Sequence, residues 1–203
     1  FDMRASATRI CNVTFTGSSN TAITGTTGTL TEFNLLTINK GNNQTPELNV
    51  DVAGTLTTPS DSWLNIQNGT FKFSKATTIT LTNVGGNIFT IAPTAQLSVN
   101  NASAIINIGN VASDASDLIL AGKLQILSGT VNIGNTANAT NNDIEYSGSG
   151  FPEIELLGGT LNVNGQIRKS AISTAGALVY KQSGASVVLF LVKTNWPGNP
   201  NCR

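Results

Sequence analysis

The sequence contains no histidine and only two cysteines, Cys11 and Cys202, among its 203 residues. Histidine and cysteine are the usual protein ligands of zinc and related metals. The two cysteines lie at opposite ends of the chain and form no CxxC pair, so a zinc site of the common types is excluded.

Charged residues are scarce and balanced. Lys plus Arg number 11 and Asp plus Glu number 11, and charged residues make up 11% of the chain, against about 25% in typical soluble proteins. Nucleic-acid binding needs a basic face that neutralises phosphates, so we expect no nucleic-acid partner. With so little charge to keep molecules apart, we expect association with other chains.

Long apolar runs are also missing. The apolar run at residues 187–192 is far shorter than the roughly 20 residues that cross a bilayer as a helix, so we expect no membrane insertion. The chain starts with Phe1, and we interpret it as a piece of a longer precursor. Its abundance of Asn and Thr, with little Lys and Glu, predicts a secreted or cell-surface location, where disulfides are permitted.

The sequence is rich in one repeated phrase. SGTVNIG at residues 128–134 returns as GGTLNVNG at residues 158–165, and shorter versions begin at Gly28, Gly54 and Gly69. Each copy is a glycine turn, a threonine or a similar residue, and an alternation of apolar and polar residues. A recurring turn–strand unit with no helix between copies is typical of stacked repeat architectures.

Short alternating segments follow one another at intervals of 7 to 9 residues between Leu48 and Ile105, and continue from Leu118 to Ile167. Three such intervals make a coil of about 24–26 residues, close to the distance from Gly28 to Gly54. We therefore predict an all-β fold, a right-handed parallel β-helix (β-solenoid) with three short strands per coil. A β-sandwich is the alternative, but Asn-Gly hairpin turns are nearly absent.

We expect one solenoid domain over residues 1–203. Residues 1–46 form less regular N-terminal coils or a cap, residues 47–192 the stacked coils, and residues 193–203 a C-terminal linker or cap. The segment from Leu30 to Ile38 permits a short helix, but its Thr and Asn content favours a strand. The Asn and Thr of the repeated phrase recur at one phase of the coil, which predicts polar ladders between stacked coils.

Four carboxylates are the candidate metal or catalytic groups: Asp143, Glu145, Glu153 and Glu155. Alternation along a strand places the members of each pair on one face. Converging carboxylates hold Ca²⁺ or act as acid and base on a polysaccharide, whereas isolated ones are ordinary solvated surface residues. We expect no cofactor, and we name these four positions as the ones to hold Ca²⁺ if it binds.

A 13-residue interval separates the strand starts Val131 and Ile144, and it contains the polar stretch from Gly134 to Asn142. We predict a corner loop that protrudes from the stack, where such folds place their specificity. The candidate ligand residues of this loop are Asn135, Asn138, Asn141 and Asn142.

Threonine clusters occur at Thr14/Thr16, Thr55/Thr57 and residues 78–82. Regular threonine ladders bind ice or an ordered glycan surface, but the irregular spacing of these clusters argues against a plane that matches ice. Ordinary β-propensity also explains them. The amphipathic aromatics Trp63, Tyr146, Tyr180 and Trp196 are scattered rather than grouped as a sugar platform, and Phe71, Phe73 and Phe89 are expected in the core.

The cysteines have no obvious partner within such a fold. Coils stack at about 4.8 Å each, so six to eight coils separate the chain ends by roughly 30–40 Å, whereas a disulfide needs Cα atoms within about 7 Å. Cys11 and Cys202 are therefore free, or they bond to another subunit or to a flanking segment, unless one end folds back.

The segments LSGTVNIG, LGGTLNVNGQI and GALVYKQSGASVV resemble the repeats of large secreted β-helix proteins of bacterial surfaces, adhesins among them. The likeness covers roughly residues 48–192 and concerns the style of the repeat. It implies extracellular display, tandem or multimeric arrangement, and binding through corners and loops.

Our leading hypothesis is a structural or adhesive surface module that forms a stiff rod and associates with copies or neighbouring domains. A carbohydrate-binding module is the alternative. A polysaccharide lyase is third: pectate-lyase-like enzymes resemble the chain in architecture, and Arg168 or Lys169 would supply the base. We expect the protein not to be an enzyme.

Overall fold

The computed structural model describes residues 11–26, 31–57, 63–81, 89–109, 117–134, 142–146, 148, 150–170, 176–184 and 186–189. Within these ranges the chain forms strands and no helix. The strands are β1 (Asn12–Phe15), β2 (Thr21–Thr24), β3 (Thr31–Glu32), β4 (Leu35–Asn39), β5 (Glu47–Asp51), β6 (Gly54–Thr57), β7 (Leu64–Phe73), β8 (Thr77–Leu81), β9 (Phe89–Ile91), β10 (Ala95–Ile108), β11 (Leu118–Leu120), β12 (Lys123–Ile133), β13 (Ile144–Tyr146), β14 (Glu153–Leu156), β15 (Thr160–Val163), β16 (Ile167–Lys169), β17 (Val179–Gln182) and β18 (Ser186–Leu189).

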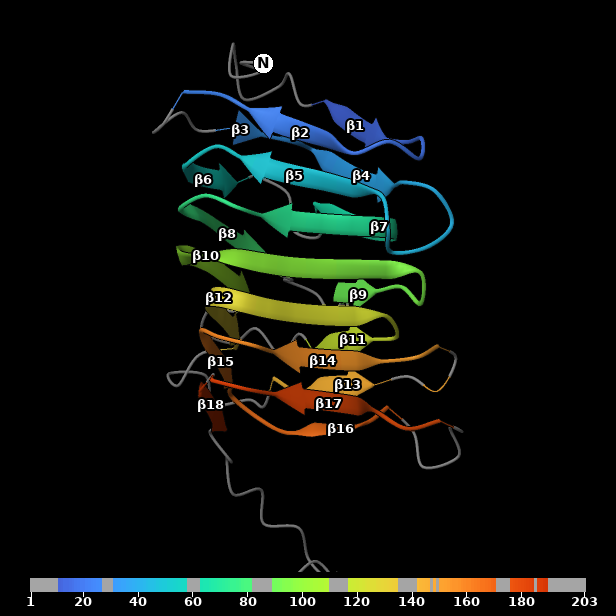
Figure 1. Ribbon diagram of the computed structural model, residues 1–203, viewed down its shortest axis with the longest axis vertical. Coiled ribbons are helices and arrows are strands. Elements are labelled where there is room, and N and C mark those ends of the chain that lie inside the picture. Colours follow the sequence, from blue (N-terminus) through green and yellow to red (C-terminus); the bar gives the residue numbers. More distant parts are fainter. Residues whose placement is uncertain are drawn as a thin grey trace, which may run out of the picture.

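The strands form three columns, in which each strand pairs in parallel with the equivalent strand of the next coil (Figure 1). Column A contains β1, β4, residues 64–68 of β7, β9, β11, β13 and β16. Column B contains β2, β5, residues 70–73 of β7, residues 95–99 of β10, residues 123–126 of β12, β14 and β17. Column C contains β3, β6, β8, residues 105–108 of β10, residues 130–133 of β12, β15 and β18.

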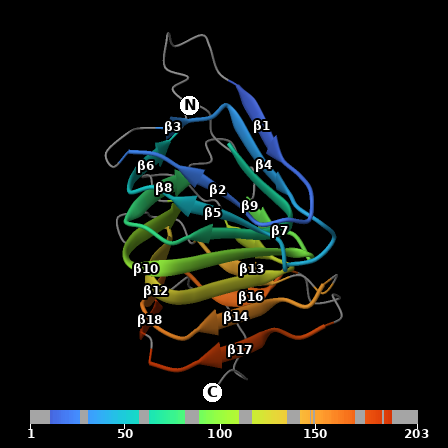
Figure 2. The same ribbon diagram turned by 45° about the horizontal axis from the view of Figure 1, so that its top comes forward.

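This arrangement is a parallel β-solenoid and confirms the predicted fold class. All these pairings are parallel, which excludes the sandwich alternative, since a sandwich is built from antiparallel sheets. Register partners in successive coils lie 23 residues apart at Leu48 and Phe71 and 30 residues apart at Leu124 and Ile154. Viewed from the N-terminal end, the chain winds clockwise as it moves away from the viewer, so the coil is right-handed (Figures 1 and 2).

Alternation along each strand produces one continuous core. Inward side chains stack on their equivalents in the next coil, as in the fully buried row of column B: Leu48, Phe71, Leu97, Leu124 and Ile154. The rings of Phe71 and Phe73 meet edge to face with centroids 4.7 Å apart, which confirms their predicted place in the core. Burying these side chains is the main source of stability, at about 25 cal/mol per Å² of apolar surface.

The glycines of the repeated phrase form the corner between columns B and C. Gly129 and Gly159 have φ of 96° and 73°, in the left-handed region that favours glycine. A Cβ on Gly159 would lie 2.3 Å from the carbonyl oxygen of Gly129, so the two corners stack too closely for any side chain. Glycine is therefore required here because it permits both the backbone conformation and the close stacking of the corners.

The region expected to hold less regular N-terminal coils or a cap contains paired strands. Column pairing begins with β1 and β4, so paired coils already occur before residue 47, and β4 confirms the strand expected between Leu30 and Ile38. The C-terminal linker or cap expected at residues 193–203 lies outside the described residues.

Candidate functional site

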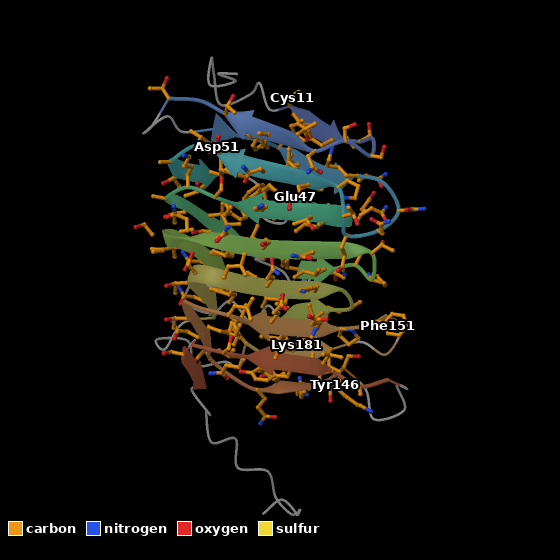
Figure 3. The ribbon with its side chains drawn as sticks, in the orientation of Figure 1. Cys11, Glu47, Asp51, Tyr146, Phe151 and Lys181 are labelled. Carbon is orange, nitrogen blue, oxygen red and sulfur yellow. The ribbon has the colours of Figure 1, made fainter. Side chains whose placement is uncertain are left out.

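The outer face of column B carries long polar side chains that bond from one coil to the next. Near the N-terminal end, Lys72 Nζ lies 3.1 Å from Glu47 Oε2. In the middle, Gln125 accepts hydrogen bonds from Gln96 and Ser98, and its own Nε2 donates to Glu155 at 2.7 Å. Figure 3 shows the span of this face, from Glu47 near one end to Lys181 near the other.

Lys123 is the centre of the strongest ion-pair group on this face. Its Nζ lies 2.7 Å from Glu155 Oε2 and 3.1 Å from Glu153 Oε1. Glu153 also accepts a hydrogen bond from Lys181 of the following coil at 3.0 Å. The carboxylates of β14 therefore lie between the ammonium group of Lys123 in the preceding coil and that of Lys181 in the following coil.

The charges of this group shift one another's proton affinities. Partial burial acts to lower the pKa of Lys123, but hydrogen bonds and attraction from Glu155 and Glu153 outweigh it and raise that pKa above its usual value. Burial acts to raise the pKa of Glu153, but Lys181 and Lys123 outweigh it and lower that pKa. The Lys123 and Gln125 hydrogen bonds lower the pKa of Glu155. All three groups are thus held in their charged forms.

The four carboxylates named as calcium candidates do not converge. Glu153 and Glu155 face outward from column B, whereas Asp143 and Glu145 belong to column A or the corner before it. Each pair already binds a cation of the protein. Within the described residues, no group of three or more His, Cys, Asp or Glu side chains is placed to hold a metal ion.

Asp143 belongs to a ladder at the corner that precedes column A. Asp117 Oδ1 accepts the backbone N–H of Asp143 at 2.7 Å, and Asp143 Oδ1 accepts the backbone N–H of Gln166 at 2.7 Å. Asp117 and Asp143 thus occupy equivalent positions at this corner in successive coils. The ladder links three coils through backbone groups that have no strand partner there.

Arg168 closes this ladder. Its guanidinium lies 2.5 Å from Asp143 Oδ2 and 2.6 Å from Glu145 Oε1. Burial raises the pKa of Asp117, and the negative charges of Asp143 and Glu145 add to the rise, while the Asp143 backbone N–H opposes it. Arg168 thus contacts Asp143 and Glu145, two of the four carboxylates named as acid–base candidates, whereas Glu153 lies apart in column B.

The outer face of column C has a different chemistry, with two rows of short side chains. The threonine row runs through register partners Thr55, Thr78, Ile105, Thr130, Thr160 and Ser186. The asparagine row runs through Thr80, Asn107, Asn132 and Asn162.

The asparagine row is a hydrogen-bonded ladder. Asn162 Nδ2 donates to Asn132 Oδ1 at 2.7 Å, and Asn132 Nδ2 donates to Asn107 Oδ1 at 2.8 Å. Asn107 Nδ2 in turn lies 3.4 Å from Thr80 Oγ1. This confirms that the asparagines of the repeated phrase stack on the coils above and below.

The structure describes only part of the loop that was expected to carry a ligand. Asn135, Asn138 and Asn141 lie outside the described residues. Asn142 is fully buried, and its backbone N–H donates to the carbonyl of Asn164 at 3.1 Å. A Cβ on Gly134 would meet the Asn142 side chain, so Asn142 packs inside the corner.

The cysteines and aromatics are distributed along the stack. Cys11 is a free, half-buried thiol at the N-terminal end, and Cys202 lies outside the described residues. Trp63 is buried, and its Nε1 donates to the carbonyl of Thr80 at 3.1 Å, so it is a core residue. Trp196 also lies outside the described residues.

Sequence reasoning missed Phe151, whose side chain is 91% exposed. It lies in the corner between β13 and β14, close along the chain to Tyr146 (Figure 3). The available signal was its position after the glycine- and serine-rich residues 147–150, where a large apolar side chain has no strand to pack on. An isolated phenylalanine in such a corner is available to a partner.

Comparison with protein-family models, with curated proteins and with solved structures gives no match for this chain. The described residues contain no helix that is long and apolar enough to cross a membrane.

Proposed function

We propose that the protein is a structural module of an extracellular surface, a stiff and adhesive rod that associates with copies of itself or with neighbouring domains. The observation that carries this proposal is the continuity of bonding along the long axis. Backbone pairing in three columns and side-chain ladders outside them join each described coil to the next.

The ladders support stiffness because they resist both bending and twisting of one coil against another. The ion pairs and amides of column B run along one face. The asparagine row runs along a second face, and the Asp117–Asp143–Arg168 ladder lies beside column A. Bending toward any side would compress or stretch at least one of these series.

The last described coil supports association. Among the described residues, β16, β17 and β18 pair with strands on one side only. Tyr180 pairs with the core residue Ile154, so it belongs to a core row, yet its side chain is 43% exposed. Strand edges with unpaired backbone groups and uncovered core rows are templates for further strands.

The proposal predicts an elongated particle whose mass rises with concentration. Light scattering measures the mass, and small-angle X-ray scattering measures the length. Tyr180→Lys places a charge in the uncovered core row and should abolish association while the circular-dichroism spectrum stays unchanged. Thr90→Lys, at an exposed outward position of β9 in the middle of column A, is the matched control and should associate like the unmodified chain. A protein that is monomeric at all concentrations would contradict the association.

A second candidate function is carbohydrate binding, and the exposure of Phe151 favours it. An aromatic ring presents a flat apolar face on which a sugar ring can stack. The test is binding to a glycan array. Phe151→Ala should remove binding, whereas Leu157→Ala changes another exposed apolar corner residue, at 44% exposure, and should leave binding intact. Equal binding by both variants would exclude this corner.

A further inference from the structure

The outer face of column C is free of charge along six successive strand segments. Residues 54–57, 77–81, 105–108, 130–133, 160–163 and 186–189 include no Asp, Glu, Lys or Arg. Column B of the same coils carries Glu47, Lys72, Lys123, Glu153 and Glu155. The segregation is complete over these segments, so the two faces suit partners of different chemistry.

The short side chains of this face are held in place. The asparagine amides are oriented by their ladder, with donor–acceptor distances of 2.7 and 2.8 Å. Threonine is branched at Cβ and has few rotamers available on a strand. A face that is already ordered loses little conformational entropy when it binds, which favours a partner that is itself rigid.

The two rows form a two-dimensional array that is polar except at Ile105 and at Val188, the register partner of Asn162. Neighbouring strands lie about 4.8 Å apart, and outward residues i and i+2 lie about 6.6 Å apart along each strand. In the sequence, the unequal intervals between threonine clusters argue against a regular plane. The structure overturns that argument for Thr55 and Thr78/Thr80, because the corners absorb the differences in length and the strands stay in register. Thr14 belongs to column A instead.

The size and composition of the face select the partner. Six strands of four residues cover about 29 Å by 13 Å, on the order of 400 Å², which is about half of the roughly 800 Å² per partner in a stable protein complex. None of the two rows' residues is aromatic, so the face has no ring to stack on a sugar. The partner that fits these properties is an uncharged, extended solid surface. Its own hydrogen-bonding groups must repeat at short intervals, as the side chains of this face do.

We propose that the outer face of column C binds ice. The hydroxyl and amide groups of the two rows hold first-layer water in positions that repeat in two directions, and that water joins the crystal lattice. The threonine methyl groups and Ile105, 38% exposed, exclude disordered water between these positions. This activity uses a different surface from the rod ends, so it stands or falls independently of the proposed function.

The experiment measures how much of the full chain is incorporated into a slowly growing polycrystalline ice hemisphere, together with thermal hysteresis. The unmodified protein should be enriched in the ice relative to an inert soluble protein of equal size. Thr130→Lys puts a long charged side chain at the centre of the face, and it should reduce incorporation to the inert level. Thermal unfolding of each variant verifies that it is folded.

The matched control is Thr90→Lys, the same change at an outward position of β9 in column A. It should be incorporated like the unmodified protein. The proposal is overturned if the unmodified protein is excluded from ice, or if both lysine variants behave alike. It is also overturned if pull-down shows Thr130-dependent binding to crystalline cellulose or chitin without ice incorporation, or if Thr130→Lys only changes the mass in solution.

Discussion

The outer faces of columns B and C surround the same core, and β10 and β12 contribute to both columns, yet the two faces differ in chemistry. Residues 123–126 of β12 direct Lys123 and Gln125 outward into an ion-pair network, and residues 130–133 of the same strand direct Thr130 and Asn132 into uncharged rows. A single glycine corner at Gly129 separates them. Packing of the core therefore requires only that apolar residues alternate with outward ones. The residue types at the outward positions can differ from one face to the next.

The largest expected effect tests whether the two columns share one core. Leu124→Ala in column B and Leu161→Ala in column C each remove a fully buried side chain. Each should destabilise the protein by about 2–5 kcal/mol, because the lost burial leaves a cavity. Chemical denaturation of both variants measures this. If only one of the two losses fell within this range, the core rows of columns B and C would not contribute equally to stability.

An intermediate effect is expected from the asparagine row. Asn132→Ala removes one donor and one acceptor from the ladder and leaves the amides of Asn107 and Asn162 without this partner. We expect a loss of about 1 kcal/mol, which should not depend on salt since no charge is involved. Thr90→Ala, at an exposed outward position of β9, is the control and should change stability much less. A salt-dependent loss would contradict the neutral character of this face.

The smallest effect is expected from column B, because its ion pairs lie on the outer face of the stack, where solvent and salt screen them. Lys123→Gln should destabilise the protein at neutral pH by about 1 kcal/mol or less, and added salt should shrink the difference. Measuring stability at low and high ionic strength checks this. A loss equal in 20 mM and 1 M salt, values that span Debye lengths of roughly 20 to 3 Å, would contradict an electrostatic role.

The pH dependence of the same variant has a defined sign. The pKa values of Glu153 and Glu155 are lowered from 4.5, so their contribution is present above pH 4.5 and lost as pH falls through the lowered values. The pKa of Lys123 is raised from 10.5, so its contribution is present below pH 10.5 and lost as pH rises through the raised value. The difference between the unmodified protein and Lys123→Gln should therefore be greatest between these limits.

Much of the fold was predictable because it depends on local repetition. The alternation around Val131 and Leu161 predicts inward and outward positions, and the glycines before them predict the corner. Stacked asparagines were likewise predictable from their constant phase. The grouping of charges was not, because Lys123, Glu153 and Lys181 meet only when coils of unequal length come into register.

Two side chains show that residue type alone does not predict whether a position is buried. Lys40 is fully buried in a corner, where its Nζ lies 3.4 Å from the carbonyl oxygen of Thr16 one coil earlier. Phe151 is 91% exposed in another corner. Both contradict the usual preference of their residue types. The corner, whose path depends on the coils on either side, decides which side chain is covered.

By itself, the sequence determined the repeating unit: a glycine corner, a short strand with one inward row, and no helix, because these depend on backbone preference and alternation over a few residues. Only the tertiary structure decided which distant residues share a face. Coil lengths vary between 23 and 30 residues, and the corners take up the difference, so the lateral order of charges and threonines follows from strand register. Register is set by packing the core rows on one another, which is a property of the whole stack.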